Sequence, residues 1–367
     1  MKHQYRLYGW QVSFFSGKLR AYMNFKGLDF EEKPASAYDL FKRLPKNISA
    51  SAMPALETDT GEWLGDTTDI MATLEQRHPE PSITPPTAVQ QLVAMLLEAW
   101  ADDALIPIAL HTRWSHSENY GSFRDEGGKA LFPFAPARVR NFVVDNTAAK
   151  RMRGALSRVG VTDNQKPLLD DWILDVLDEL ATHLSQNPYL LGDRPCVADY
   201  SLAGLFYAHL NNDSWPEREL MRPRPSLQDY TKRTHDGTPA GSSWHDGNRI
   251  PGTLMPLLRR IAHEFIPMIE ATVVEIKRCV EDRQLKTNDS LPRALPDIAF
   301  PMGNGTYIRH SFSHTVWKMQ RLQTAFLNLS ESAQTEAAEL FSSIGISLGA
   351  LDLGPALKRQ GLGTALA

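Results

Sequence analysis

The predicted secondary structure changes character once along the chain, at the Pro-rich stretch 78–86. Before this stretch, short β-prone runs alternate with helical patterns. The predicted elements are a strand at 5–10, a helix at 16–26, a strand at 28–33, a hairpin at 55–64 and a helix at 66–77. This order predicts a mixed sheet with helices on both faces.

Beyond the Pro-rich stretch, strand signals nearly vanish and helical periodicity dominates. Helices are predicted at 89–105, 168–184, 197–210, 254–280, 314–327 and 330–341. Two segments rich in turn formers, 114–136 and 211–252, are longer than usual connections, and such segments are commonly functional or mobile. We therefore expect an α/β domain at 1–80, a helical domain at 87–250 and an additional helical extension at 251–367 packed on it.

Charge and cysteine content exclude several classes of protein. The formal net charge is −4 and no long run of Lys and Arg occurs, which disfavours a nucleic-acid partner. The only cysteines, Cys196 and Cys279, fit neither a disulfide framework nor a four-ligand zinc site, so we expect a reducing, cytoplasmic setting. No signal peptide is recognisable, and charged residues interrupt the most apolar stretch, 254–280. We expect a soluble protein with no membrane partner.

Four short motifs occur in a fixed order. They are SFFSGKLR at 13–20 with FKGLDFE at 25–31, MPAL at 53–56, DTTDI at 66–70, and LGDRPCVADY at 191–200. Together they resemble the glutathione transferase superfamily, with a serine-type, zeta-like first motif. The resemblance is firm over 5–80 and 165–210. It is loose elsewhere, because the chain is much longer than a typical member.

The resemblance implies a fold and an activity. The fold would be a thioredoxin-like α/β domain followed by a large all-α C-terminal domain. The activity would be that of a glutathione transferase, in which glutathione, as co-substrate, attacks a small hydrophobic electrophile by conjugation, thiolytic cleavage or isomerisation. Such enzymes lower the pKa of the glutathione thiol, because the thiolate is the nucleophile. A role in detoxification and a homodimer are also implied.

Three hydroxyl groups are candidates for stabilising the thiolate. By the resemblance, Ser13 lies just before the first helix, where a hydroxyl and the helix dipole both favour a negative charge. Ser16 is the alternative inside the helix, and Tyr8 is the rival at the end of the first strand. Ser13 also has a purely structural interpretation, because serine is a preferred helix cap. Tyr8 likewise has one, as a residue of the sheet face.

Four further residues would hold glutathione. The resemblance implies a cis peptide bond before Pro54, which would present the backbone of Met53 to the cysteinyl part of the ligand. Asp66 and Thr67 would bind the γ-glutamyl end, Asp66 through the ammonium and Thr67 through the carboxylate. The alternatives are a trans proline that begins an edge strand and, for Asp66 and Thr67, ordinary helix capping.

Other polar and aromatic residues have weaker signals. Cys196 and Asp199 occupy a capping-box position, so Cys196 is expected to be a buried structural thiol. The close histidine pairs, 111 with 116 and 310 with 314, lack a third ligand, and no metal site is predicted. Five aromatic residues are expected either to line a pocket or to pack a loop: Trp114, Tyr120, Phe123, Phe132 and Phe134.

Two other kinds of protein remain open beside the transferase. A non-catalytic binding or assembly protein would keep the fold without the chemistry, since a fold does not fix a function. A membrane-tethered relative of the metaxin type would also carry extra helices. The end of the chain, 353–367, contains Lys358 and Arg359 rather than a hydrophobic anchor, which counts against that interpretation. The segment 308–321 is rich in aromatic, His and Arg residues. Packing against the helical domain is the default expectation, and covering the active cleft or forming dimer contacts are the alternatives.

Overall fold

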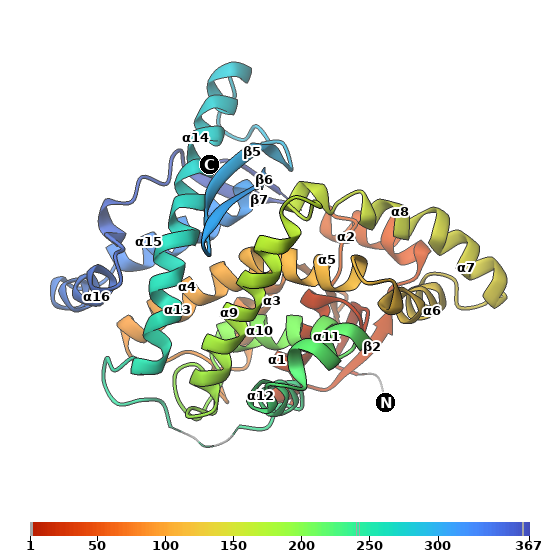
Figure 1. The fold of residues 1–367 in the computed structure, drawn as a ribbon, viewed down its shortest axis with the longest axis horizontal. Helices are drawn as coiled ribbons and strands as arrows, with labels where there is room; N and C mark the ends of the chain where they lie inside the picture. Colours follow the sequence, from red (N-terminus) through yellow and green to blue (C-terminus); the bar gives the residue numbers. More distant parts are fainter. Residues whose placement is uncertain (1–2, 240, 242, 362) are drawn as a thin grey trace. The chain divides into compact units, whose positions relative to one another are not determined.

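The computed structural model describes residues 3–239, 241, 243–361 and 363–367. Its strands are β1 (Tyr5–Gly9), β2 (Phe30–Pro34), β3 (Ala55–Thr58), β4 (Trp63–Gly65), β5 (Leu295–Met302), β6 (Gly305–Ser311), β7 (Leu357–Gln360) and β8 (Gly363–Leu366). The helices of the first half are α1 (Phe14–Phe25), α2 (Leu44–Ile48), α3 (Thr67–Arg77), α4 (Ala88–Ala104), α5 (Ile106–Trp114), α6 (Tyr120–Leu131), α7 (Ala137–Asn146) and α8 (Ala148–Arg153). The later helices are α9 (Lys166–Leu184), α10 (Val197–Leu205), α11 (Ser214–Pro216), α12 (Pro225–His235), α13 (Met255–Arg260), α14 (Ile266–Arg283), α15 (Ser313–Leu327) and α16 (Glu331–Ser343) (Figure 1).

The chain packs into two compact units, each built from three separate stretches. Unit 1 comprises Met1–Ile83, Ile108–Leu156 and Asn187–Ser243. Unit 2 comprises Thr84–Pro107, Ser157–Gln186 and Trp244–Ala367. The predicted α/β domain at 1–80 lies within unit 1. The helices predicted for 87–250 are divided between the two units, and all of 251–367 belongs to unit 2.

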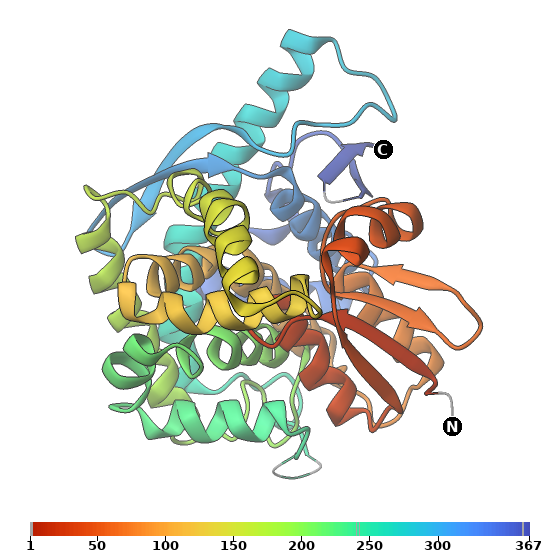
Figure 2. The same ribbon diagram turned by 90° about the vertical axis from the view of Figure 1, so that its right-hand side faces the viewer.

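Unit 1 contains a four-stranded mixed sheet with the order β2-β1-β3-β4, whose arrows are seen at the right of Figure 2. β1 runs parallel to β2 and antiparallel to β3, and β3 is antiparallel to β4. Apolar residues from α1, α3 and the strands form a core on one face, and the region around α2 packs on the other. The strand-helix order predicted for the first 80 residues, including the hairpin at 55–64, is confirmed.

The helix α1 is held in place by close contact with α10. Gly17 and Gly204 meet at this contact, and a Cβ atom built on Gly17 would lie 3.2 Å from the Gly204 backbone. Because neither residue has a side chain, the two backbones approach more closely than other residues would permit. The contact fixes the position of α1 and therefore of the loop that precedes it.

Replacing Gly204 by alanine is expected to lower the free energy of unfolding by about 1–3 kcal/mol, as overpacking of a core does. The added Cβ would lie 2.6 Å from the Phe14 carbonyl oxygen and 2.7 Å from the Lys18 amide nitrogen, both backbone atoms. Gly121→Ala is the matched control, since nothing lies within 4 Å of its Cβ. Chemical denaturation measures both variants. An equal loss of stability in the two would contradict the close-contact argument.

Unit 2 contains most of the long helices together with two hairpins. The large helical remainder is confirmed, but the hairpins β5–β6 and β7–β8 were not predicted. In the first hairpin, Met302 pairs with Gly305, so Gly303 and Asn304 form a two-residue turn, with φ of +54° at Gly303. Gly and Asn are the residues that such turns require. The helical extension expected at 251–367 is therefore partly β-structure.

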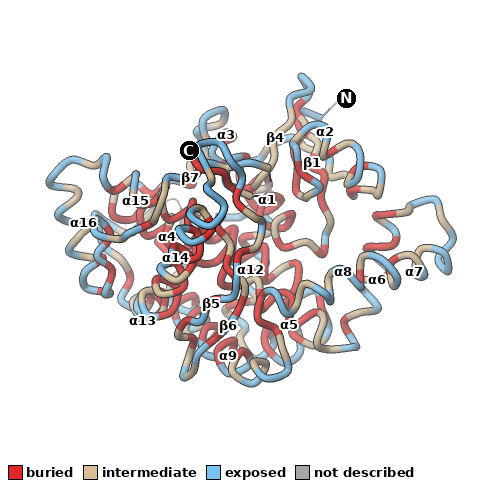
Figure 3. The backbone as a smooth tube through the Cα atoms, turned by 90° about the horizontal axis from the view of Figure 1, so that it is seen from above, coloured by how far each residue is buried: buried red, intermediate tan, exposed pale blue. Residues whose placement is uncertain are grey.

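Buried ion pairs join α4 to the C-terminal segments within unit 2. α4 is buried along most of its length (Figure 3). Lys318 of α15 contacts Asp102 and lies 3.8 Å from Glu98, while Arg309 of β6 donates to Asp103 at 3.0 Å. Buried charges require partners of this kind. Cations of the segment 308–321 thus neutralise carboxylates of α4.

The two segments predicted as long connections contain helices. The first, 114–136, includes α6 despite its three glycines, and the second, 211–252, includes α12. Phe123 and Leu131 of α6 and Leu227 and Tyr230 of α12 are buried, so tertiary packing overrides weak helical propensity. No helix among the described residues has the length and apolarity needed to span a bilayer.

Candidate functional site

Strand register brings the predicted binding residues to one end of the sheet. Tyr8 near the end of β1 pairs with Ala55 at the start of β3, and Ala55 pairs with Gly65 at the end of β4. The loop after β1, the residues before β3 and the residues after β4 therefore leave the sheet at the same end. These three connections carry Ser13, Met53–Pro54 and Asp66–Thr67. Parts of the chain far apart in sequence thus come together at one end of the sheet.

Ser13 caps the N-terminus of α1. Its backbone is extended, with φ of −102° and ψ of 125°, and its Oγ accepts a hydrogen bond from the Ser16 amide at 3.4 Å. The side chain is half-buried, and among the described residues no acceptor is found for its hydroxyl hydrogen. The hydroxyl can therefore donate to an anion while it still accepts from the helix. The helix dipole favours a negative charge at the same place.

Ser16 holds the loop that precedes α1. Its side chain is fully buried, and its Oγ accepts from the Trp10 amide at 3.3 Å. A Cβ atom at Gly9 would lie 2.8 Å from this Oγ, which shows how tightly the loop packs over Ser16. An enclosed hydroxyl has no access to a ligand. We therefore assign Ser16 a structural role and keep Ser13 as the candidate.

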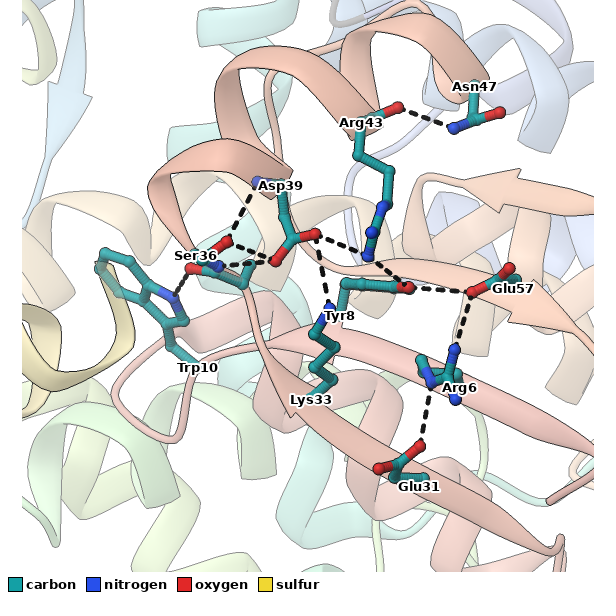
Figure 4. A network of polar contacts seen from close by, with 11 residues as sticks. Arg6, Tyr8, Trp10, Glu31, Lys33, Ser36, Asp39, Arg43, Asn47 and Glu57 are labelled. Carbon is teal, nitrogen blue, oxygen red and sulfur yellow. Dashed lines mark hydrogen bonds and ion pairs between the residues drawn. The ribbon is translucent and has the colours of Figure 1, made fainter. Parts of the chain in front are cut away.

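The Tyr8 hydroxyl belongs to a polar network on the face of the sheet that the region around α2 covers (Figure 4). It donates to Glu57 Oε2 at 2.9 Å and accepts from Arg43 Nη1 at 3.1 Å. Burial and then the hydrogen bond to Glu57 raise the pKa of Tyr8 above its usual value. Arg43 in turn pairs with Asp39 at 2.8 Å. Since its hydrogen is donated to Glu57, Tyr8 is a weaker candidate than Ser13.

The peptide bond between Met53 and Pro54 is cis, as predicted. β3 begins two residues after Met53, and Pro54 is buried while Met53 is half-buried. Within the described chain, neither the N–H nor the C=O of Met53 has a backbone partner. Backbone groups rarely stay unpaired unless water or a ligand reaches them. Met53 therefore offers one donor and one acceptor to an extended ligand.

Asp66 and Thr67 begin α3. Asp66 has φ of +69°, which is uncommon for a residue other than glycine, and such conformations concentrate at binding sites. Its carboxylate accepts from the Thr68 amide at 2.9 Å. The Thr67 side chain is buried, but Thr67 is the first helical residue, so its amide has no partner inside the helix. This start of α3 can bind a carboxylate through Thr67 and a cation through Asp66.

Two buried arginines fix the Ser13 loop, and sequence reasoning found neither role. Arg20 of α1 donates to both carboxylate oxygens of Glu32, at 2.7 and 2.5 Å, and to the Trp10 carbonyl at 3.2 Å. Arg20 is part of the first sequence motif, so the sequence marks its position. The sequence does not indicate that its partner is Glu32 on β2. The bidentate pair is the stronger kind of charged hydrogen bond. It anchors the beginning of the loop.

The second arginine, Arg113 of α5, anchors the residue next to Ser13. Its Nη1 donates to the Val12 carbonyl at 2.6 Å, and its Nη2 donates to the Ala208 carbonyl at 2.5 Å. Its Nε donates to Asp213 at 2.8 Å, and both side chains are almost fully buried. Burial lowers the pKa of Arg113 and raises that of Asp213, because desolvation disfavours the charged form of each group.

Asp199 caps α10 as the motif predicted. Its carboxylate accepts from the Cys196 amide at 2.8 Å, the Leu190 amide at 3.0 Å and the Tyr230 hydroxyl at 2.9 Å. Complete burial raises the pKa of Asp199 to about 6, although these hydrogen bonds act to lower it. Cys196 is fully buried, and burial raises the pKa of its thiol. A buried thiol with a raised pKa is unreactive, so this element serves folding.

The five aromatic residues considered for a pocket separate into two groups. Phe123 is buried and packs with Val12, and Trp114 lies edge-to-face against it at 4.8 Å between ring centres. Phe134 is fully exposed. The inner residues thus pack α6 beside the Ser13 loop. Among the described residues, no three His, Cys, Asp or Glu side chains are grouped closely enough to hold a metal ion.

Comparisons with known proteins found one family model and several solved structures that are similar to this chain. The family model for the glutathione S-transferase N-terminal domain matches residues 7–82. No curated protein matches the chain. A glutathione S-transferase from Methylobacterium radiotolerans, solved with glutathione sulfonate, is 21% identical with a TM-score of 0.40, over 66% of this chain and 98% of its own.

Two other solved structures are similar over a comparable length. A beta-etherase from Sphingobium sp. strain SYK-6 is 17% identical with a TM-score of 0.36, over 63% of this chain and 99% of its own. A bacterial maleyl pyruvate isomerase of the zeta class is 18% identical with a TM-score of 0.38, over 65% of this chain and 100% of its own. Their activities differ from each other, so the comparison selects no reaction for this chain.

Proposed function

We propose that the chain binds glutathione at the sheet end described above, because residues 7–82 match the family model of the glutathione S-transferase N-terminal domain. There it lowers the pKa of the glutathione thiol for attack on a small hydrophobic electrophile. Conjugation, thiolytic cleavage and isomerisation all use this thiolate as the nucleophile. The rate gain would come from the higher thiolate fraction and from proximity of the two substrates.

Each candidate residue has a distinct role in this proposal. The Ser13 hydroxyl donates to the thiolate at the N-terminus of α1. The backbone of Met53, presented by the cis bond to Pro54, pairs with the cysteinyl part of glutathione. At the start of α3, the Thr67 amide binds the γ-glutamyl carboxylate, and Asp66 pairs with the ammonium group. Arg20 and Arg113 position the loop that carries Ser13.

One observation carries the proposal: the unpaired backbone of Met53 lies at the same sheet end as two helix N-termini, those of α1 and α3. Unpaired backbone groups suit the peptide units of glutathione, and helix N-termini suit its anionic groups. Helix capping alone accounts for Ser13 and Asp66. It does not account for the unpaired backbone of Met53, nor for the strand register that brings the loop after β1 and the residues before β3 and after β4 to the same sheet end.

A second candidate function is glutathione binding without catalysis. Both Ser13 and Asp66 already serve as helix caps, so their presence is compatible with a protein that uses the fold only to bind or assemble. The two functions differ in the bound thiol. A catalytic site lowers its pKa, and a binding protein leaves it unchanged.

Calorimetric titration with glutathione tests the binding step. We expect the wild type to bind, and Asp66→Asn to bind about tenfold or more weakly, because a charged hydrogen bond is lost. Asparagine keeps the acceptor for the Thr68 amide and tolerates positive φ, so the cap survives. Asp69→Asn, on the same turn but exposed, is the control and should bind like the wild type. Absence of binding by the wild type at millimolar glutathione would refute the proposal.

The homodimer and the cytoplasmic location are part of the same proposal, since both follow from the family. Sedimentation equilibrium of the full chain tests the first. A dimer supports the proposed homodimer, and a monomer at all concentrations would refute it.

A further inference from the structure

Residues 129–156, which include the end of α6 and all of α7 and α8, are strongly basic. They contain six Lys or Arg residues and one Asp, a net charge of +5, whereas the whole chain carries −4. Such a local excess of one sign within an acidic protein indicates a surface for a partner of the opposite charge.

The same segment exposes large apolar side chains. Phe134 is 100% exposed, Phe142 69% and Val139 51%. Nine large apolar side chains are exposed in the described part of the chain, and three of them fall within these nine residues. Exposed apolar side chains scattered singly are ordinary, but a concentration indicates an interaction site.

Helical spacing places the charge and the apolar groups on one face of α7. Val139 precedes Phe142 by three residues and Arg138 precedes it by four, so both side chains neighbour that of Phe142 on the helix surface. All three residues are exposed. Figure 3 shows the exposed course of α7 in pale blue. This face combines a cation with aromatic and aliphatic groups.

The opposite face of α7 is firmly packed. Val144 is fully buried in a cluster with Phe123 and Leu131, and Asp145 accepts a hydrogen bond from Tyr120. The guanidinium of Arg153 lies 4.5 Å from the centre of the Tyr120 ring. The exposed face is therefore presented by an anchored helix and is not the result of a detached one.

We propose that α7 and the adjoining parts of α6 and α8 bind the surface of membranes that contain anionic lipids. Phe134, Val139 and Phe142 insert at the interface, and the surrounding Lys and Arg residues contact the headgroups. An interfacial helix combines apolar insertion with basic residues in this way. The contact lies on the membrane surface and needs no spanning helix. It departs from the sequence expectation of no membrane partner.

Two observations favour a lipid surface over a nucleic acid. The pI of the chain is about 6.3, whereas a nucleic-acid-binding domain is commonly strongly basic. Aliphatic Val139 shares the face with the two phenylalanines, and an aliphatic side chain inserts into lipid but offers no stacking surface to a base. The inference is independent of glutathione binding.

Vesicle flotation with the full chain tests the proposal. We expect it to float with vesicles of phosphatidylcholine and phosphatidylglycerol but not with phosphatidylcholine alone. Binding should weaken as salt rises, because the Debye length falls from about 10 Å at 0.1 M to about 3 Å at 1 M. Equal binding to both vesicle types, or to neither, would overturn the proposal. So would tight binding of a fluorescent single-stranded RNA without vesicle binding.

Substitutions locate the surface. Phe134→Ser with Phe142→Ser, and separately Arg138→Gln with Lys150→Gln, should each lower the vesicle partition coefficient about tenfold or more. Leu327→Ser is the matched control, because Leu327 is 55% exposed in unit 2. It should bind vesicles like the wild type. Thermal unfolding confirms that each variant folds. Vesicle binding that survives both double substitutions, or that Leu327→Ser abolishes, would place the contact elsewhere.

Discussion

Replacing Ser13 by alanine is expected to raise the pKa of the bound glutathione thiol by about 1 to 2 and to lower kcat/KM about 10- to 100-fold. The physical reason is the loss of one hydrogen bond to a charged sulfur, which is worth about 1.5–3 kcal/mol. Glutathione affinity should change little, because Met53, Asp66 and Thr67 make the other contacts. Steady-state kinetics with a generic aromatic electrophile measure the effect.

Two controls separate catalysis from capping at Ser13. Ser13→Thr keeps both the hydroxyl and the cap and should retain most activity. Ser13→Gly removes the hydroxyl but lowers helix stability by only a few tenths of a kcal/mol, compared with about 0.5–2 kcal/mol for alanine. If the glycine variant is as active as the wild type, Ser13 is only a cap. Unfolding measurements on the same variants report the capping contribution.

Replacing Arg113 by methionine is expected to lower the free energy of unfolding by about 3–5 kcal/mol, because Asp213 is left charged and buried without a partner. The carbonyls of Val12 and Ala208 lose their donors at the same time. Since Val12 precedes Ser13, any folded variant should also show a raised pKa of the bound thiol. Denaturant unfolding measures the first effect and thiolate absorbance the second.

The matched control for Arg113 is Arg218→Met. Arg218 pairs with Glu118 and Glu219, and all three side chains are nearly half exposed. Surface pairs of this kind contribute about 0–1 kcal/mol. The double variant Arg113→Met with Asp213→Leu removes both charges and should recover much of the stability without recovering the thiol pKa. If Arg113→Met and Arg218→Met lose the same free energy of unfolding, the buried pair of Arg113 and Asp213 contributes no more to stability than a surface pair.

Local sequence signals predicted the fold of the first domain well, because its motifs depend on local geometry. The loop before α1, the cis bond at Pro54 and the start of α3 each rest on a few consecutive residues. The same is true of the cap formed by Cys196 and Asp199. At each of the helix caps among these positions, the side chain lies within about one helical turn of a backbone amide to which it is hydrogen-bonded.

Interactions between distant residues could not be predicted. Arg113 and Asp213 are 100 positions apart, and nothing in either neighbourhood marks a buried pair. Arg309 and Asp103 are likewise separated by 206 positions. Each partner has the sequence context of an ordinary surface charge, and only tertiary packing buries it. The network of Tyr8 with Glu57 and Arg43 is a further example.

The first hairpin was missed for a different reason. Gly303 and Asn304 form a recognisable two-residue turn, but Pro296 and Pro301 in the flanking strand argue against a strand there. A two-stranded hairpin has free edges on both sides, so prolines are tolerated. The helix α6 was missed because glycine-rich sequence weakened its pattern, while burial of Phe123 stabilises it.

The central claim is that this sheet end lowers the pKa of the glutathione thiol. Ultraviolet thiolate absorbance of glutathione bound to the wild-type protein, followed across pH, tests it most directly. A site of the proposed kind gives a midpoint well below the value of about 8.5 for a free thiol. A midpoint equal to that of free glutathione, with binding established by calorimetry, would contradict the claim and identify a protein that binds glutathione without activating it.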